Sequence, residues 1–114
     1  MRHAESDIQR LCVKWFKYQF PTEVLFSVPN GGFRNKVTAA IMKAEGAMAG
    51  VADLFLMKAA HGFNGLFIEM KTRDGRQSDT QKAFQAKCYD KGYQYVVCKS
   101  FEEFRATIND YLSV

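Results

Sequence analysis

Two short apolar runs lie close together in residues 51–71, which read VADLFLMKAAHGFNGLFIEMK. The runs 53–58 and 65–71 have the length of strands and are rich in Leu, Phe and Ile, and residues 59–64 separate them. Two such runs joined by a short link that contains glycine are typical of an antiparallel hairpin. We therefore expect the central pair of strands here, with the rest of the fold built around it.

The flanking sequence alternates between helical and strand-like patterns. The expected helices cover about residues 4–18, 36–45, 78–90 and 100 onward, and the expected strands about residues 24–28, 53–58, 65–71 and 94–99. Local signals mark several helix ends: Asn35 is a candidate N-cap, Gly46 a stop, and Ser78 with Gln81 a capping box. The expected order of elements is αβαββαβα.

The strand–helix–strand unit over residues 65–99 decides the fold class. Such a unit normally closes as a right-handed crossover with parallel strands, whereas the strands of the hairpin are antiparallel. The sequence therefore predicts an α/β protein with a small mixed sheet flanked by helices. Because the 114 residues contain no internal repeat or linker, we expect one domain over residues 1–114.

Composition excludes several classes of protein. Hydrophobic residues make up 47% of the chain and charged residues 25%, which is the balance of a globular protein. No apolar stretch approaches the roughly 20 residues that cross a bilayer, and no signal-peptide core is present, so we expect a cytoplasmic protein. Cys12, Cys88 and Cys98 include no C-x-x-C pair, which favours free thiols over disulfides or a zinc site.

The net charge of +4 and the pI near 9.0 favour a polyanionic partner. Clustered Lys and Arg side chains gain free energy by releasing counterions from phosphates. Many basic proteins bind no nucleic acid, so the charge alone is weak evidence.

Two carboxylates interrupt the apolar runs. Asp53 and Glu69 would be costly in a plain core, because a buried charge needs a partner or a metal ion. Side chains alternate along a strand, so Glu69 and Lys71 point to the same face. A link centred near His61 places Asp53 opposite Glu69, where both can share one ion, whereas a link centred on residues 63–64 separates them.

Converging carboxylates suit a hard cation such as Mg²⁺ or Mn²⁺, with waters or a phosphate oxygen as the remaining ligands. The ion would polarise a phosphodiester and lower the pKa of a bound water, while Lys71 orients or helps to deprotonate the nucleophile. The inferred reaction is phosphodiester hydrolysis. An E-x-K tripeptide alone is weak evidence, since such a pair in a strand is more often a surface charge pair.

Several segments together resemble a known family. Gly50-Val51-Ala52-Asp53 followed by Ile68-Glu69-Met70-Lys71 resembles the PD-(D/E)XK nucleases, with Ala52 in place of the nominal proline. The additional segments that make the chain similar to the VRR-NUC branch are Val28-Pro29-Asn30-Gly31-Gly32, Gly46, Gly75-Arg76-Gln77-Ser78 and Gln81. The resemblance covers nearly the whole chain. It implies a restriction-endonuclease-like core and a Mg²⁺-dependent deoxyribonuclease in which Mn²⁺ substitutes.

The resemblance also implies further site residues. It adds the backbone carbonyl of Met70 to the metal ligands and places Gln81 beside the active site, although Gln81 is equally explained as the capping partner of Ser78. Glu5 lies one turn before Ile8 on the apolar stripe of the first expected helix, so it could reach the metal. It could also be a carboxylate favoured by the helix dipole.

Basic and polar residues near the expected site are candidates for binding nucleic acid. Those residues are Asn30, Arg34, Lys36, Arg73, Arg76 and Lys82. They could hold a DNA backbone through hydrogen bonds and charge, although a Gly-Gly turn explains Asn30 and a solvated loop explains the later cations.

The leading function is thus a metal-dependent endonuclease acting on DNA. The resemblance implies branched, flapped or four-way junction DNA as the substrate. One active site cuts one strand, so a homodimer is expected for cutting two strands of a junction. We expect no small-molecule cofactor. The alternative is a non-catalytic or partner-dependent nucleic-acid-binding module of the same fold.

Overall fold

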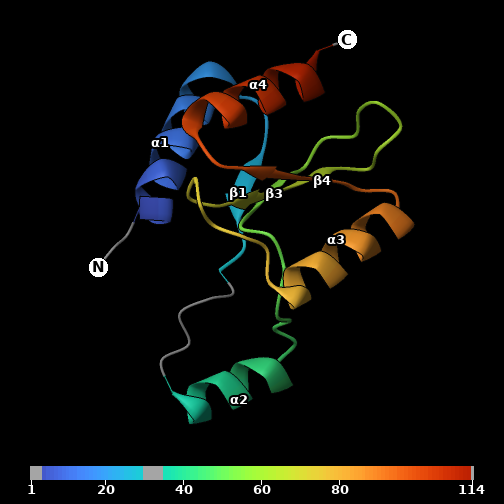
Figure 1. Ribbon diagram of the computed structural model, residues 1–114. Helices are drawn as coiled ribbons and strands as arrows, with labels where there is room; N and C mark the ends of the chain where they lie inside the picture. Colours follow the sequence, from blue (N-terminus) through green and yellow to red (C-terminus); the bar gives the residue numbers. More distant parts are fainter. Residues whose placement is uncertain (1–3, 30–34, 114) are drawn as a thin grey trace.

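The computed structural model describes residues 4–29 and 35–113, in which helices lie on both faces of one sheet (Figure 1). In chain order the elements are α1 (Ala4–Gln19), β1 (Leu25–Ser27), α2 (Lys36–Ala44), β2 (Leu54–Leu56), β3 (Leu66–Met70), α3 (Asp79–Asp90), β4 (Gln94–Cys98) and α4 (Phe101–Leu112). The order αβαββαβα and the α/β class confirm the prediction from sequence. Each strand is shorter than the apolar run that predicts it, because only part of each run pairs with a neighbour.

The sheet has four strands in the order β1-β2-β3-β4. β2 pairs antiparallel with both β1 and β3, and β3 pairs parallel with β4. Helix α3 makes the connection between the two parallel strands, as the strand–helix–strand pattern predicts. The mixed sheet therefore has its parallel pair at one edge and its antiparallel hairpin in the centre.

The hairpin between β2 and β3 has a definite register. Leu54 pairs with Ile68 and Leu56 with Leu66, so the turn is centred on His61. His61 itself adopts a positive φ of 53°, which lets the chain reverse there. One step beyond the last pair, Asp53 falls opposite Glu69. Of the two registers that the sequence allows, the structure has the one that brings the carboxylates together.

The two faces of the sheet are covered differently. Helices α1 and α4 lie side by side over one face and form the main core (Figure 1). The buried residues of that core are Cys12, Phe16, Leu25, Leu54, Leu56, Leu66, Ile68, Met70, Cys98, Phe104, Ile108 and Tyr111. Helix α3 covers the opposite face, where a smaller cluster contains Ala52, Cys88 and Tyr95. Because side chains alternate along β3, Glu69 points to the α3 side.

Helix caps follow the signals in the sequence. The Asn35 side chain accepts a hydrogen bond from Thr38 N, and Ser78 forms a full capping box with Gln81. Cys12, Cys88 and Cys98 are free and buried, as expected. None of the helices in the described ranges is long and apolar enough to cross a membrane.

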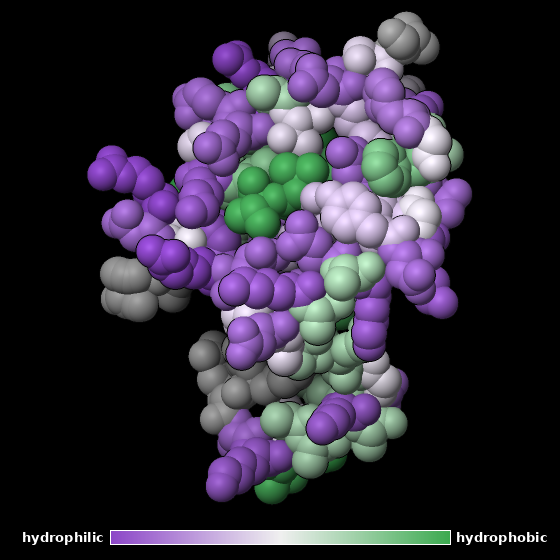
Figure 2. All heavy atoms as spheres, turned by 45° about the vertical axis from the view of Figure 1, so that its right-hand side comes forward, coloured by the Kyte–Doolittle hydropathy of each residue, from purple (hydrophilic) through white to green (hydrophobic). Residues whose placement is uncertain are grey.

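Helix α2 is the exception to the layered packing. It lies away from the sheet in Figure 1, and no residue of it is buried. Val37 and Ile41 are 70% and 53% exposed. Figure 2 shows apolar side chains on the surface over this part of the molecule. An apolar stripe that faces solvent on a short helix is a candidate contact surface.

Candidate active site

Asp53, just before β2, accepts two hydrogen bonds from backbone amides. Its side-chain Oδ2 accepts from Met70 N at 2.7 Å, and its carbonyl accepts from Val28 N at 2.8 Å. These contacts join β1, β2 and β3 at one end of the sheet. The carboxylate is therefore fixed beside the strand that carries Glu69.

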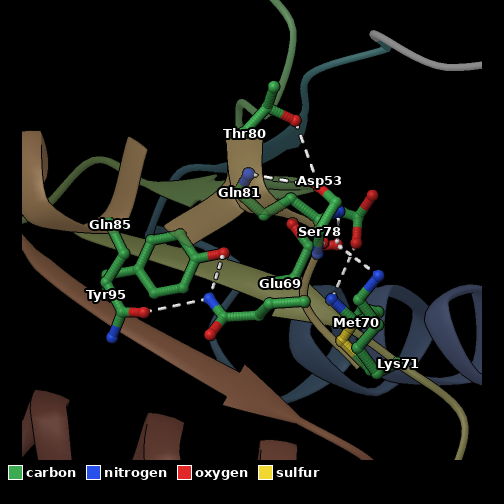
Figure 3. A network of polar contacts seen from close by, with 10 residues as sticks. Asp53, Glu69, Met70, Lys71, Ser78, Thr80, Gln81, Gln85 and Tyr95 are labelled. Atoms are coloured by element: carbon green, nitrogen blue, oxygen red, sulfur yellow. Dashed lines mark hydrogen bonds and ion pairs between the residues drawn. The ribbon is translucent and has the colours of Figure 1, made fainter. Parts of the chain in front are cut away.

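Glu69 is the one buried charged residue in the described parts of the chain, with 2% of its surface exposed. Its Oε2 accepts a hydrogen bond from Gln81 Nε2 at 3.0 Å and lies 3.9 Å from Lys71 Nζ (Figure 3). Its Oε1 is buried and has no hydrogen-bond partner among the described residues. Such an orphaned oxygen is costly unless a cation or another group is meant to reach it.

The surroundings of Glu69 raise its proton affinity. Burial raises the pKa of Glu69 to about 8, and the neighbouring Asp53 carboxylate acts in the same direction. Lys71 opposes this rise, whereas Glu5 adds to it. A divalent cation between the carboxylates would replace the proton that the pair otherwise retains.

The donor set fits a hard cation that keeps part of its hydration. Asp53 and Glu69 can supply carboxylate oxygens, and the carbonyl of Met70 lies between Glu69 and Lys71 in the chain. Within residues 4–29 and 35–113 no group of three His, Cys, Asp or Glu side chains stands close enough to hold one ion. A transition-metal cage of side chains is thus not formed there, whereas two carboxylates completed by water or phosphate oxygens suit Mg²⁺.

Glu5 lies beside the site rather than in its centre. It is exposed on α1 and lines a hollow of about 470 Å³ together with Arg10, Asp53 and Thr72. Its effect on the pKa of Glu69 shows that its charge is felt at the carboxylate pair. The role of Glu5 as a metal ligand stays a prediction.

Gln81 satisfies both interpretations of the sequence at once. Its Oε1 accepts from Ser78 N at 2.8 Å to complete the capping box, while its Nε2 donates to Glu69. The cap thereby aims the amide at the carboxylate. Gly50 helps to set this geometry, because a Cβ there would lie 2.3 Å from Thr80 O. The segment before Asp53 can therefore lie directly against the start of α3.

The cations predicted to bind nucleic acid are placed unequally. Arg76 and Lys82 line a hollow of about 390 Å³, and Arg73 is exposed in the loop that follows β3. In the described part of the chain none of the three forms an ion pair. Lys36 is exposed at the start of α2, away from the sheet (Figure 1). Asn30 and Arg34 lie outside the described residues.

Sequence reasoning missed two groups near the site. Lys99 lines the hollow with Arg76 and Lys82. Met70 pairs with Cys98, so Lys99 just after β4 lies beside Lys71 just after β3. Gln77 Nε2 donates to Gln85 Oε1 at 2.9 Å and to the Tyr95 hydroxyl at 3.3 Å. The parallel pairing could have located Lys99, whereas no local pattern indicated the glutamine–tyrosine network.

The fold and the site define a nuclease-like α/β domain with two carboxylates and a lysine at one end of its central strands. The VRR-NUC domain family matches residues 3–102, so the chain belongs to this family, which falls within the PD-(D/E)XK nucleases. A solved structure described as a VRR_NUC domain protein matches with a TM-score of 0.79 and 24% identity, covering 95% of this chain and 87% of that one. That likeness supports the fold. A comparison with curated proteins finds no match.

Replacing Glu69 with Gln should make the stability of the metal-free protein less dependent on pH. The folded chain keeps the Glu69 proton up to a pKa of about 8, whereas the unfolded chain releases it near 4.5. Between these values the unfolded state binds fewer protons, so the free energy of unfolding falls as pH rises. Glutamine has no such proton to release.

Urea denaturation in EDTA at pH 5 and pH 8 measures this effect. Glu69→Gln should gain stability relative to wild type on going from pH 5 to pH 8. The exposed Glu45→Gln is the control and should follow wild type at both values. An equal difference between Glu69→Gln and wild type at the two pH values would contradict the raised pKa.

Proposed function

We propose that the chain is a divalent-cation-dependent endonuclease that hydrolyses phosphodiester bonds in DNA. The observation that carries this proposal is the buried Glu69, whose Oε1 lacks a partner in the described structure while Asp53 and Lys71 stand beside it. A structural ion pair would leave no such oxygen unsatisfied. Membership of the VRR-NUC family supports a nuclease-like domain acting on DNA.

Asp53, Glu69 and the carbonyl of Met70 would hold the cation, with Glu5 contributing from α1. Mg²⁺ suits these oxygen donors, and Mn²⁺ would substitute. When bound, the cation supplies Lewis-acid polarisation of the phosphodiester and offsets the charge that develops on it. Gln81 keeps the Glu69 carboxylate in place by its hydrogen bond to Oε2.

In the reaction, a water oxygen forms a bond to phosphorus as the bond from phosphorus to a sugar oxygen breaks. The water proton leaves, and the departing sugar oxygen gains a proton. The Lys71 side chain is 13% exposed and projects next to Glu69, so it can hold the attacking water and offset negative charge on the phosphate. We therefore assign Lys71 the role of a catalytic residue that orients the attacking water.

Branched, flapped or four-way junction DNA is the proposed substrate class, following the resemblance to the VRR-NUC branch. Arg73, Arg76 and Lys82 would hold the strand through its phosphates close to Lys71. Asn30, Arg34 and Lys36 would add contacts from the region before α2. Phosphate contacts fix the position of a strand without reading its sequence, which suits recognition of shape.

A homodimer is the proposed assembly, with residues 1–114 forming one nuclease domain per copy. One site cuts one strand, so two sites related by a two-fold axis could cut two strands of a junction. The exposed stripe of α2 offers an interface, because Val37, Ile41 and the following Met48 are 70%, 53% and 48% exposed. Apolar surface of this kind marks protein contacts.

A second candidate function is a nucleic-acid-binding module that is non-catalytic or needs a partner. The observation that favours it is the absence, among the described residues, of three acidic, His or Cys side chains around one ion. Such a module would bind DNA tightly and cleave none of the substrates on its own.

Lys71→Ala should lower the cleavage rate by roughly 10²- to 10⁴-fold, the usual range for a group that assists proton transfer. DNA affinity and thermal stability should stay close to wild type, because Lys71 contributes one of many positive charges. Single-turnover cleavage and fluorescence anisotropy measure the two quantities. Lys87→Ala, an exposed lysine on α3, is the control. Equal losses of rate and affinity would argue against a catalytic role.

The double variant Arg76→Ala, Lys82→Ala should bind duplex DNA more weakly and with less salt dependence. Removing two phosphate contacts should make the slope of log K against log salt shallower by about two. Anisotropy titrations over a range of salt give this slope. Lys14→Ala with Lys17→Ala removes the same charge from exposed positions on α1. An unchanged slope in Arg76→Ala, Lys82→Ala would mean that the DNA phosphates bind elsewhere on the protein.

Ile41→Asp should convert the dimer to a monomer in sedimentation equilibrium, because a charge would then be buried in the interface. Leu11→Asp is a matched control, since Leu11 on α1 is 52% exposed and Ile41 is 53% exposed. The control should remain dimeric. A monomeric wild type, or a dimer that survives Ile41→Asp, excludes this interface.

A further inference from the structure

Tyr95 is a buried tyrosine close to the proposed active site. It lies in β4 opposite Phe67 of β3, and only 2% of its surface is exposed. Phe67 and Glu69 are two residues apart on β3, so both side chains point to the α3 face. In Figure 3 the ring of Tyr95 directs its hydroxyl toward Glu69. A polar group so deeply buried requires hydrogen-bond partners.

The hydrogen bonds around Tyr95 determine what its hydroxyl can still do. Gln77 Nε2 donates to the hydroxyl oxygen, and the same amide nitrogen donates to Gln85 Oε1. The oxygen is therefore an acceptor in this network, which leaves the hydroxyl hydrogen free to be donated elsewhere. Gln85 lies one turn after Gln81 on α3, so both glutamine side chains reach the same side of the helix.

The hydroxyl stays protonated. Burial raises the pKa of Tyr95 above its ordinary value, and the negative charges of Glu69 and Asp53 contribute to the rise. Tyr95 thus offers an O–H donor near the carboxylate pair and not a phenolate. Within the described residues, Glu69 Oε1 is the buried side-chain oxygen that lacks a donor.

We propose that Tyr95 is a positioning residue whose hydroxyl donates a hydrogen bond to Glu69 Oε1. Because Oε1 has no partner in the described structure, the bond requires one of the two side chains to rotate from the position that it has there. Gln81 holds Oε2 and Tyr95 holds Oε1, so the carboxylate is fixed in the orientation in which it meets the cation. Gln77 and Gln85 orient the hydroxyl for this task. A carboxylate oxygen has more than one acceptor site, so Oε1 can accept this bond and still bind a cation. The cation itself rests on the proposed function.

The expected effect follows from the general behaviour of groups that orient metal ligands. Loss of such a hydrogen bond typically lowers metal affinity by about 10- to 100-fold. Tyr95→Phe removes the hydroxyl and keeps the ring, which packs against Phe84 with a centroid distance of 6.2 Å. The variant should therefore fold like wild type.

Calorimetric titration of the full chain with Mn²⁺ tests the proposal. The Kd for Mn²⁺ should rise at least about 10-fold in Tyr95→Phe. Tyr93→Phe is the matched control, because its ring packs on Phe67 but its hydroxyl makes no hydrogen bond with a described residue. An unchanged Mn²⁺ affinity in Tyr95→Phe, with wild type binding Mn²⁺, overturns the role of Tyr95.

A double-mutant cycle without metal separates this proposal from the proposed function. Tyr95→Phe and Glu69→Met are combined, and thermal stability is measured in EDTA. Coupling between the two changes, absent when Tyr93→Phe replaces Tyr95→Phe, supports the contact with Glu69. Additive effects overturn the contact. A wild type that binds no Mn²⁺ would count against the metal site, while the cycle would still decide whether Tyr95 holds Glu69.

Discussion

The antiparallel register of β2 and β3 is the constraint on which the rest of the structure depends. Leu54 faces Ile68 across the two strands, which puts the leucines of β2 into the core beneath α1 and α4. A slip of one residue would turn those leucines to the other face and separate Asp53 from Glu69. The packing that stabilises the fold and the pairing that forms the site therefore come from the same register.

Burying the Glu69 carboxyl group costs free energy, and the surrounding residues offset only part of this cost. Gln81 donates to one carboxylate oxygen, Lys71 lies within 3.9 Å, and burial with Asp53 nearby still raises the pKa to about 8. A sheet selected for stability alone would carry an apolar residue at this position. Strongly shifted pKa values of this kind are common in active sites.

Much of the fold could be read from local signals, but the choice of register could not. The cap at Asn35 and the capping box at Ser78 involve residues three apart, so the sequence alone predicts them. The turn at His61 depends on a positive φ that is unusual for a residue other than glycine, so two registers remained open. The structure selects between them.

The site was predictable where it lies on strands and not where it depends on tertiary contacts. Asp53 and Glu69 stood out because they interrupt apolar runs, and Lys71 stood out because it lies on the same face of its strand as Glu69. Tyr95 gave no such signal, because a tyrosine in an apolar strand is ordinary and only the approach of Gln77 and Gln85 shows how its hydroxyl is held. The position of α2 was likewise unpredictable, since none of its own residues is buried in the core.

Cleavage of labelled single-stranded, duplex, flapped and four-way DNA in Mg²⁺ or Mn²⁺ tests the central claim most directly. Wild type should cut at least one of these substrates, and cleavage should disappear in Asp53→Ala, in Glu69→Ala and in EDTA, with DNA binding retained by both variants. Tight binding of DNA by wild type without cleavage of any substrate would contradict the nuclease and favour the binding module.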